Sequence, residues 1–224
     1  DHIVVTPSIL TVLPGTTTQL TASGRDANEN TISGLTFTWT ATIGSVSESG
    51  LFTAPTAAGV SGYVNASAGG VMGSAAVSVS PGQLTYIIVL PDPVEVVAGE
   101  TQGFSAVGYD QYGNPLTGLT FVWTTNVGAM AGSVLTSQTT SGVTGYVRAS
   151  LGPVFDEAFV AIVPGTLDHI DVSPAELTVA SGLTAQFSAM GKDSYNNVIP
   201  GLTFTWTSTV GSVSGTGFFT AQVL

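Results

Sequence analysis

The sequence contains no cysteine, few charged residues and only three basic ones, and each shortage narrows the classes of function open to it. Without cysteine there is no disulfide, no thiol nucleophile and no cysteine-ligated zinc. The basic residues Arg25, Arg148 and Lys192 stand against 14 acidic ones, giving a formal net charge of −11. Nucleic acid is therefore excluded as a partner, because binding a phosphate backbone needs a basic stripe, and anionic membrane surfaces are disfavoured for the same reason.

Charge of either sign is scarce, and long apolar runs are absent. Charged residues make up 8% of the chain, against about 25% in an ordinary soluble domain. Two explanations are open: neighbouring copies cover part of the surface, as in a filament or lattice, or glycans mask a Thr/Ser-rich surface. No apolar run reaches the roughly 18 residues that a membrane-spanning helix needs. The segment is predicted to have no membrane span, and without a signal peptide at Asp1 we interpret it as a mature or excised piece.

What the chain does contain is one module written nearly three times. A Gly-Leu-Thr-Phe-x-Trp-Thr segment occurs at 34–40, 118–124 and 201–207. Its tryptophans are 84 and 83 residues apart, the length of one small domain. We place repeat one at 1–84, repeat two at 85–167 and repeat three at 168–224. Short linkers with one Pro and one Gly, at 81–84 and 164–167, predict restrained joints between them.

Within each repeat, apolar and polar residues alternate, which is typical of half-buried strands and not of helices. Phe37 and Trp39 share one face, and Thr38 and Thr40 share the other. Turn residues separate such segments every 8 to 12 residues or so, as in β-sandwiches. The sequence therefore predicts an all-β chain of tandem β-sandwiches joined end to end. We expect nearly buried, core-defining tryptophans, and not a sugar-stacking platform, at Trp39, Trp123 and Trp206.

At these residues the chain resembles the bacterial immunoglobulin-like (Big) domains of prokaryotic cell-surface proteins, including intimin, invasin and surface-layer or filament proteins. The resemblance covers repeats one and two and rests on four segments: the Gly-x-Asp-x-x-x-Asn hairpin at 108–114, the Trp strand, the turn at 50–54 copied at 217–221, and the strand at 62–67 copied at 145–150. It implies that the tandem sandwiches are immunoglobulin-like and that the protein lies outside the cell, at the cell surface. It says little about activity, because a sandwich hosts many unrelated functions. One departure is that Tyr63 and Tyr146 fall out of phase with the inward residues, so we expect them to point outward.

Asp26, Asp110 and Asp193, each followed four residues later by Asn, are candidate calcium ligands. The alternative is a turn in which each carboxylate accepts hydrogen bonds from nearby backbone amides. Calcium takes about 6 to 8 oxygen ligands, and one Asp with one Asn leaves most of them missing. Ligand number therefore favours the turn, and no other cofactor or metal is indicated.

No catalytic residue is predicted. A recurring Ser-His-Asp arrangement and a phosphate-binding glycine loop are both absent, so we expect a protein that is not an enzyme. Repeats one and two contain no lysine, which excludes a Lys–Asn isopeptide bond in them. Asn65, in Asn65-Ala66-Ser67, is a candidate glycosylation site on the face that we expect to point outward.

Repeat three stops before the counterparts of 60–67 and 72–80, so we expect it to lack its last two strands. Completion by strands of another chain and excision from a longer array are both open. Repeat one begins at its first strand with no extension to donate, which favours the longer array. Without assembly we expect repeat three to be disordered or to aggregate.

These features favour a non-enzymatic structural part of an extracellular surface assembly: a fibre or filament, a surface lattice or an adhesin stalk. Its expected partners are copies of itself or neighbouring repeats in a polymer. The alternative is a spacer or carbohydrate-binding region of a secreted multidomain enzyme, with glycans as partners.

Overall fold

The computed structural model describes residues 1–223, and all regular elements among them are β-strands. Repeat one contains β1 (His2–Thr6), β2 (Ile9–Val12), β3 (Thr17–Gln19), β4 (Thr21–Arg25), β5 (Thr31–Ile32), β6 (Thr38–Ala41), β7 (Ser45–Val46), β8 (Leu51–Thr53), β9 (Ser61–Ala68) and β10 (Val71–Val79). Repeat two contains β11 (Tyr86–Leu90), β12 (Val94–Val97), β13 (Thr101–Gly103), β14 (Ser105–Tyr109), β15 (Pro115–Leu116), β16 (Val122–Thr125), β17 (Gly128–Ala131), β18 (Val134–Ser137), β19 (Val143–Leu151) and β20 (Val154–Val163). Repeat three contains β21 (His169–Ser173), β22 (Thr184–Gln186), β23 (Ser188–Lys192), β24 (Ser212–Val213) and β25 (Phe218–Thr220). Across this described part of the chain no helix is long and apolar enough to cross a membrane.

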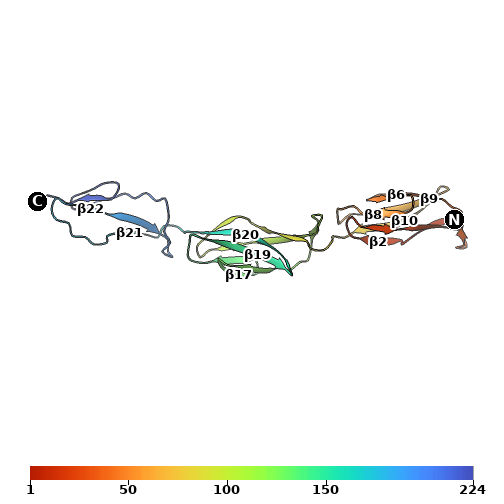
Figure 1. Cartoon of the computed structure of the whole chain (residues 1–224), viewed down its shortest axis with the longest axis horizontal. Coiled ribbons are helices and arrows are strands. Elements are labelled where there is room, and N and C mark those ends of the chain that lie inside the picture. Colours follow the sequence, from red (N-terminus) through yellow and green to blue (C-terminus); the bar gives the residue numbers. More distant parts are fainter. Residues whose placement is uncertain (224) are drawn as a thin grey trace. The chain divides into compact units, whose positions relative to one another are not determined.

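The strands of repeats one and two pair in the same order. The four-stranded sheet β2-β10-β9-β6 of repeat one matches β12-β20-β19-β16 of repeat two. Each contains one parallel pair, β2 with β10 and β12 with β20, within an otherwise antiparallel arrangement. The smaller sheets β1-β4-β5 and β3-β8-β7 match β11-β14-β15 and β13-β18-β17. Figure 1 shows β2, β10 and β9 as neighbouring strands of repeat one, and β19 and β20 as neighbours in repeat two. The predicted all-β, immunoglobulin-like fold class is confirmed.

The core of repeat one follows from the two-residue alternation of its strands. In β9, Val64 and Ala66 are fully buried, whereas the preceding residue, Tyr63, is 54% exposed. Pairing with β10 places Ala75 opposite Val64, and both fill the space between the sheets. The buried cluster comprises Ile3, Val5, Val12, Leu20, Phe52, Ala54, Val64, Ala66, Ala75, Val77 and Val79. The expected outward phase of the tyrosine is confirmed here.

The three tryptophans are partly buried, which corrects the expectation of near-complete burial. Trp39 packs against the core of repeat one, but it lies on β6, which has only β9 as a neighbour in its sheet. Its indole covers the Gly50 turn so closely that a Cβ at Gly50 would stand 2.8 Å from Cζ2 of the ring. A residue on an edge strand has no neighbouring strand on one side and stays partly open to solvent there. The centre of the core is instead formed by Phe52 and Leu20, which are fully buried.

The chain divides into two compact units that do not coincide with the repeats. The first holds Asp1–Ile88, Val107–Thr120 and Leu151–Phe155; the second holds Val89–Ala106, Phe121–Ser150 and the chain from Asp156 onward. The linker at 81–84 therefore lies inside the first unit, and the linker at 164–167 lies inside the second. Each joint is therefore packed inside one compact unit. The repeat boundaries at 84 and 167 mark the period of the sequence and not the edges of these units.

Repeat three shows which strands depend on the central pair. It has the sheets β21-β23 and β22-β25-β24, but the segments 176–179 and 205–208, which correspond to β2 and β6, are not strands. In repeat one, β2 pairs only with β10, and β6 pairs only with β9. The described residues of repeat three contain no counterpart of β9 or β10. Among the described residues, the two flanking segments therefore pair with no strand and are irregular.

We expect Phe52→Ala to destabilise repeat one more than Trp39→Ala. Truncating a fully buried aromatic side chain costs roughly 3–5 kcal/mol, whereas a partly buried one leaves less of a cavity. Amide hydrogen exchange of β9 and β10 measures the change in unfolding free energy. Val122→Ala, at a side chain that is 63% exposed, is the control and should change stability by less than about 0.5 kcal/mol. A larger loss from Trp39→Ala would contradict this assignment of the core.

Candidate functional site

The three Asp-x-x-x-Asn segments form the same turn, which we call the Asp–Asn turn (26–30, 110–114 and 193–197). In the second copy, Oδ1 of Asp110 accepts hydrogen bonds from the backbone N–H groups of Tyr112 and Asn114, both at 2.9 Å. The first and third copies repeat these two bonds at 2.8–2.9 Å. The fourth residue has a positive φ: 64° at Glu29, 80° at Gly113 and 67° at Asn196. The predicted side-chain-to-backbone turn is what the structure contains.

In repeat two this turn also binds the end of repeat one. The second carboxylate oxygen of Asp110, Oδ2, accepts a hydrogen bond from the N–H of the linker residue Gly82 at 2.8 Å. Oδ1 of Asn114 accepts one from the N–H of Ala58 at 2.9 Å, and its Nδ2 donates to the carbonyl of Thr56 at 2.8 Å. Two side chains thereby fix the linker and a loop of the preceding repeat, and we call this set of three bonds the clamp.

The clamp recurs at the next joint. Oδ2 of Asp193 accepts from the N–H of Gly165 at 2.8 Å. Oδ1 of Asn197 accepts from the N–H of Ser141 at 2.8 Å, and its Nδ2 donates to the carbonyl of Thr139 at 2.8 Å. The sequence separations are the same at both joints: 28 between glycine and aspartate, and 56 and 58 between loop and asparagine. Each clamp lies wholly within one compact unit.

A tyrosine in the middle of the turn adds a steric fit to the hydrogen bonds. A Cβ at Gly15 would stand 2.5 Å from the hydroxyl oxygen of Tyr112, and one at Gly99 would stand 2.6 Å from that of Tyr195. Both glycines have positive φ, 69° and 80°, in turns of the preceding repeat. Glycine is therefore needed twice over at these positions: for the backbone conformation and for the space that the tyrosine occupies.

Asp110 and Asp193 are buried, at 0% and 1% exposure, yet they are held ionised. Burial works to raise the pKa of Asp110, but the amide of Asn114 and the N–H groups of Gly82, Asn114 and Tyr112 outweigh it and lower the pKa to about 2. The pKa of Asp193 is lowered to about 2 by the equivalent donors against the same effect of burial. A carboxylate that accepts several N–H bonds strongly favours its charged form.

The geometry favours a structural role for these aspartates over calcium binding. Each lies beside one asparagine and backbone N–H groups, which are hydrogen-bond donors and not metal ligands. Among residues 1–223 no group of three or more His, Cys, Asp or Glu residues is placed to hold a metal ion. Calcium would need about 6 to 8 oxygens, so the candidate sites Asp26, Asp110 and Asp193 fall short in ligand number.

Sequence reasoning identified the turn but missed its reach across the joint. A turn explanation accounts for Oδ1 of Asp110 and leaves Oδ2 and the Asn114 side chain without a role. The available signal was the constant spacing of 28 residues between the linker glycine and the aspartate, at Gly82 and again at Gly165. Fixed spacing across a repeat boundary is typical of a contact that is copied together with the module.

The other candidate residues lie apart from the clamps. Asn65 is partly exposed on the outward face, and its Oδ1 accepts a hydrogen bond from Ser74 at 2.7 Å. In repeat two the corresponding positions hold Arg148 and Glu157, which form an ion pair at 2.6 Å. These outward positions thus carry cross-strand polar pairs in both repeats, and glycosylation of Asn65 stays a prediction.

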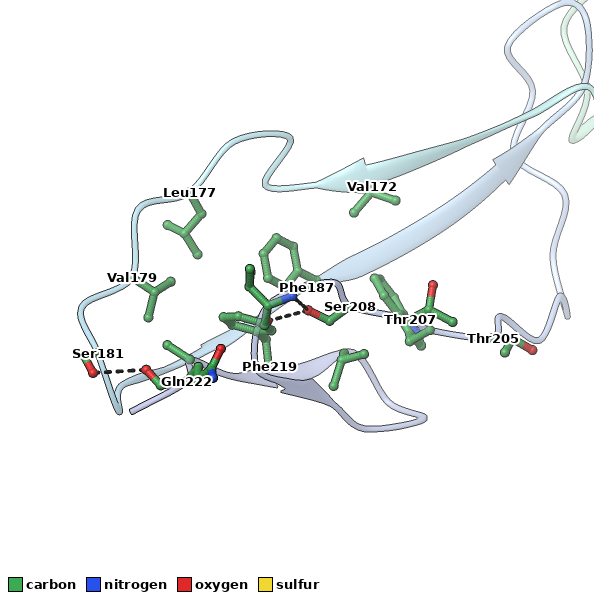
Figure 2. Close-up of a pocket in the computed structure, with 14 residues that line it drawn as sticks. Val172, Leu177, Val179, Ser181, Phe187, Thr205, Thr207, Ser208, Phe219 and Gln222 are labelled. Carbon is green, nitrogen blue, oxygen red and sulfur yellow. Dashed lines mark hydrogen bonds between the residues drawn. The ribbon is translucent and has the colours of Figure 1, made fainter. Parts of the chain in front are cut away.

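Repeat three has an open apolar cleft of about 740 Å³, and Trp206 is among its lining residues. Figure 2 shows Phe187 and Phe219 in the middle of the lining side chains, with Val172, Leu177 and Val179 around them. The two phenylalanine rings meet edge to face with centroids 6.1 Å apart. Their counterparts in repeat one, Leu20 and Phe52, are fully buried. The expectation that further strands complete this repeat stays a prediction.

No protein-family model matches the chain. Ice-binding protein 1 of Shewanella frigidimarina (strain NCIMB 400) is 26% identical over 200 residues, which is 84% of this chain and 22% of that protein, so the chain spans about a fifth of the length of this curated relative. Among solved structures, the Escherichia coli adhesin FdeC matches with a TM-score of 0.54 and 19% identity over 98% of this chain and 86% of that chain. Yersinia pseudotuberculosis InvD matches with a TM-score of 0.47 and 20% identity over 88% of this chain and 71% of that chain.

The expected resemblance to bacterial immunoglobulin-like surface domains is confirmed at the level of fold, on the FdeC likeness and the strand order. The class that the structure defines is an all-β protein of immunoglobulin-like sandwiches. Sequence identities of this size show the fold alone. Any argument about function must therefore rest on the residues of this chain and their contacts.

The clamps should resist acid until well below the ordinary carboxyl pKa of 3.8. A carboxyl whose pKa is lowered by folding contributes stability that is fully present above its unfolded pKa and is lost as the pH falls through the folded value. Carbon-13 NMR titration of the side-chain carboxyls should therefore give pKa values near 2 for Asp110 and Asp193. Asp26, which lacks the linker N–H, should titrate above them. Ordinary pKa values for the two clamp aspartates would show that the bonds to Gly82 and Gly165 do not form in solution.

Proposed function

We propose that the chain is a non-enzymatic structural segment of an extracellular surface assembly, in which clamped repeats hold a fixed spacing. The observation that carries the proposal is the clamp, which recurs at both joints with the same atoms and the same sequence separations. A spacer converts the number of its domains into reach only when its joints do not bend freely. Catalysis has no need of such repetition, whereas a stalk or filament does.

The clamp suits this role because its bonds are directional. Each joint depends on a linker N–H, a loop N–H and a loop carbonyl, which must stand in a fixed arrangement to meet one aspartate and one asparagine. A purely apolar contact would allow sliding, since hydrophobic attraction has no preferred direction. Bending the joint would take the Gly82 N–H away from a buried carboxylate, and losing one donor of a buried charged group is costly.

Surface composition supports contact with other copies. Large apolar side chains are well exposed in both complete repeats, among them Ile9 at 76% and Phe155 at 53%. Exposed apolar groups together with very low charge favour lateral association in a filament or lattice at a cell surface. Copies of this chain or neighbouring repeats are therefore the proposed partners.

One observation favours the alternative, a carbohydrate-binding or spacer region of a secreted enzyme. Tyr146 and Phe159 line a shallow groove on the outward face of repeat two, together with the acidic residues Asp92 and Glu157. Aromatic faces with nearby carboxylates suit sugar rings, which offer apolar faces and hydroxyl donors. If a glycan panel showed saturable binding that Tyr146→Ala abolished, with no self-association of the chain, the alternative would replace the structural proposal.

We expect a pair of spin labels on either side of the first joint to report a single narrow distance distribution. Glu48→Cys and Thr117→Cys supply the labels at exposed positions of the first compact unit, and the natural chain has no other thiol. Adding Asp110→Asn should broaden the distribution, because an amide N–H₂ facing the Gly82 N–H removes the acceptor.

The matched control for that measurement is Asp26→Asn, which makes the same change in a turn without upstream contacts. It should leave the distribution as narrow as in the unmodified chain. A broad distribution in the unmodified chain itself would remove the mechanical basis of the spacer proposal.

A further inference from the structure

The Asp–Asn turn of repeat one has the same internal bonds as its copies but leaves its outward groups without partners. Oδ1 of Asp26 accepts from the N–H groups of Asn28 and Asn30, as in the clamped turns. In the described part of the chain, its Oδ2 accepts only from Nδ2 of Asn30, at 3.1 Å. Within the described residues, Oδ1 of Asn30 has no donor and Nδ2 has no second acceptor. The atoms that form the clamp elsewhere are thus present but lack its contacts across a joint, and in this sense we call them the unused groups.

We propose that this turn is a docking end, which clamps the C-terminal edge of a further module of the same type joined directly ahead of Asp1. The proposal rests on the spacer function above and names its partner. In both existing clamps the linker glycine precedes the aspartate by 28 residues. The same spacing from Asp26 places the matching N–H on the third residue ahead of Asp1. The linker donor must therefore come from a covalently connected module.

The unused groups match such a module better than they match a metal ion. They comprise two acceptors, Oδ2 of Asp26 and Oδ1 of Asn30, and one donor, Nδ2 of Asn30. A cation satisfies acceptors only, whereas a linker N–H with a loop carbonyl and a loop N–H two residues apart satisfies all three. The edges of repeats one and two present this set at Gly82, Thr56 and Ala58, and again at Gly165, Thr139 and Ser141.

The docking end of repeat one differs from the other two in its middle residue. Asn28 stands where Tyr112 and Tyr195 fill the space above a glycine of the preceding repeat. The shorter side chain keeps the three hydrogen bonds but omits the steric fit. Asp26 and Asn30 would therefore form the hydrogen bonds to the preceding module. The residue at position 28 would determine how closely that module packs against the turn.

The test extends the complete chain at its N-terminus with a copy of residues 85–167, whose own linker then joins Asp1. The added linker glycine stands on the third residue ahead of Asp1, as the spacing requires. Amide hydrogen exchange, followed by NMR, compares this glycine with Gly82 and Gly165 in the same molecule. We expect all three amides to be protected, and Asp26→Asn to speed exchange of the added glycine alone by about tenfold, the size of one net hydrogen bond.

Two further variants separate the roles of the residues. Asn28→Tyr should slow exchange of the added glycine below its rate in the parent, since it restores the fit that Tyr112 makes with Gly15. Asp193→Asn is the matched control: it should release Gly165 and leave the added glycine protected.

Two results would overturn the proposal. Free exchange of the added glycine while Gly82 and Gly165 stay protected would show that repeat one does not dock, although the clamps and the spacer function would stand. Shifts of the Asp26 and Asn30 resonances on titration of the unextended chain with calcium chloride would identify a cation as the occupant instead. Loss of protection at all three glycines would count against the spacer function as well.

Discussion

The arrangement of the joints depends on one constraint: a buried carboxylate must be surrounded by hydrogen-bond donors. Asp110 draws its donors from its own turn, from Asn114 and from the linker residue Gly82. Desolvating an ionised carboxylate is costly, and the cost is offset only while all donors are in place. If the linker left the turn, Asp110 would lose the hydrogen bond from Gly82, and the desolvation of its carboxylate would no longer be fully offset. A single charge therefore couples the backbone of one repeat to the fold of the next.

Polar bonds have this role because the chain has little else to use at a joint. Its linkers are four residues long, and its three basic residues allow few ion pairs, which contribute little at a surface in any case. The side chains of the domain cores, from Ala66 to Phe52, are fully buried within a repeat and are therefore unavailable to a neighbour. The joint is instead held by directional hydrogen bonds to backbone groups. Such bonds tolerate sequence variation, because every residue has a carbonyl and every residue except proline has an N–H.

The sequence predicted what depends on local alternation and missed what depends on position within a sheet. Tyr63 outward and Val64 inward follow from the two-residue period alone, and the Asx-type turn at Asp110 follows from side-chain chemistry. The near-complete burial expected of Trp39 is wrong because burial depends on the number of neighbouring strands, and β6 has one. The cross-joint bonds of Asn114 were missed because they involve residues 56 and 58 positions away, which no local pattern links.

Repeat three separates the parts of the module that fold locally from those that need the central hairpin. Its Asp193 turn and the β21-β23 pair form fully, although the segments around Leu177 and Trp206 have no strand structure. The clamp therefore belongs to the half of the sandwich that forms without β9 and β10. That placement bears on an array, because a repeat contacts its predecessor through the Asp–Asn turn and not through its own last strands.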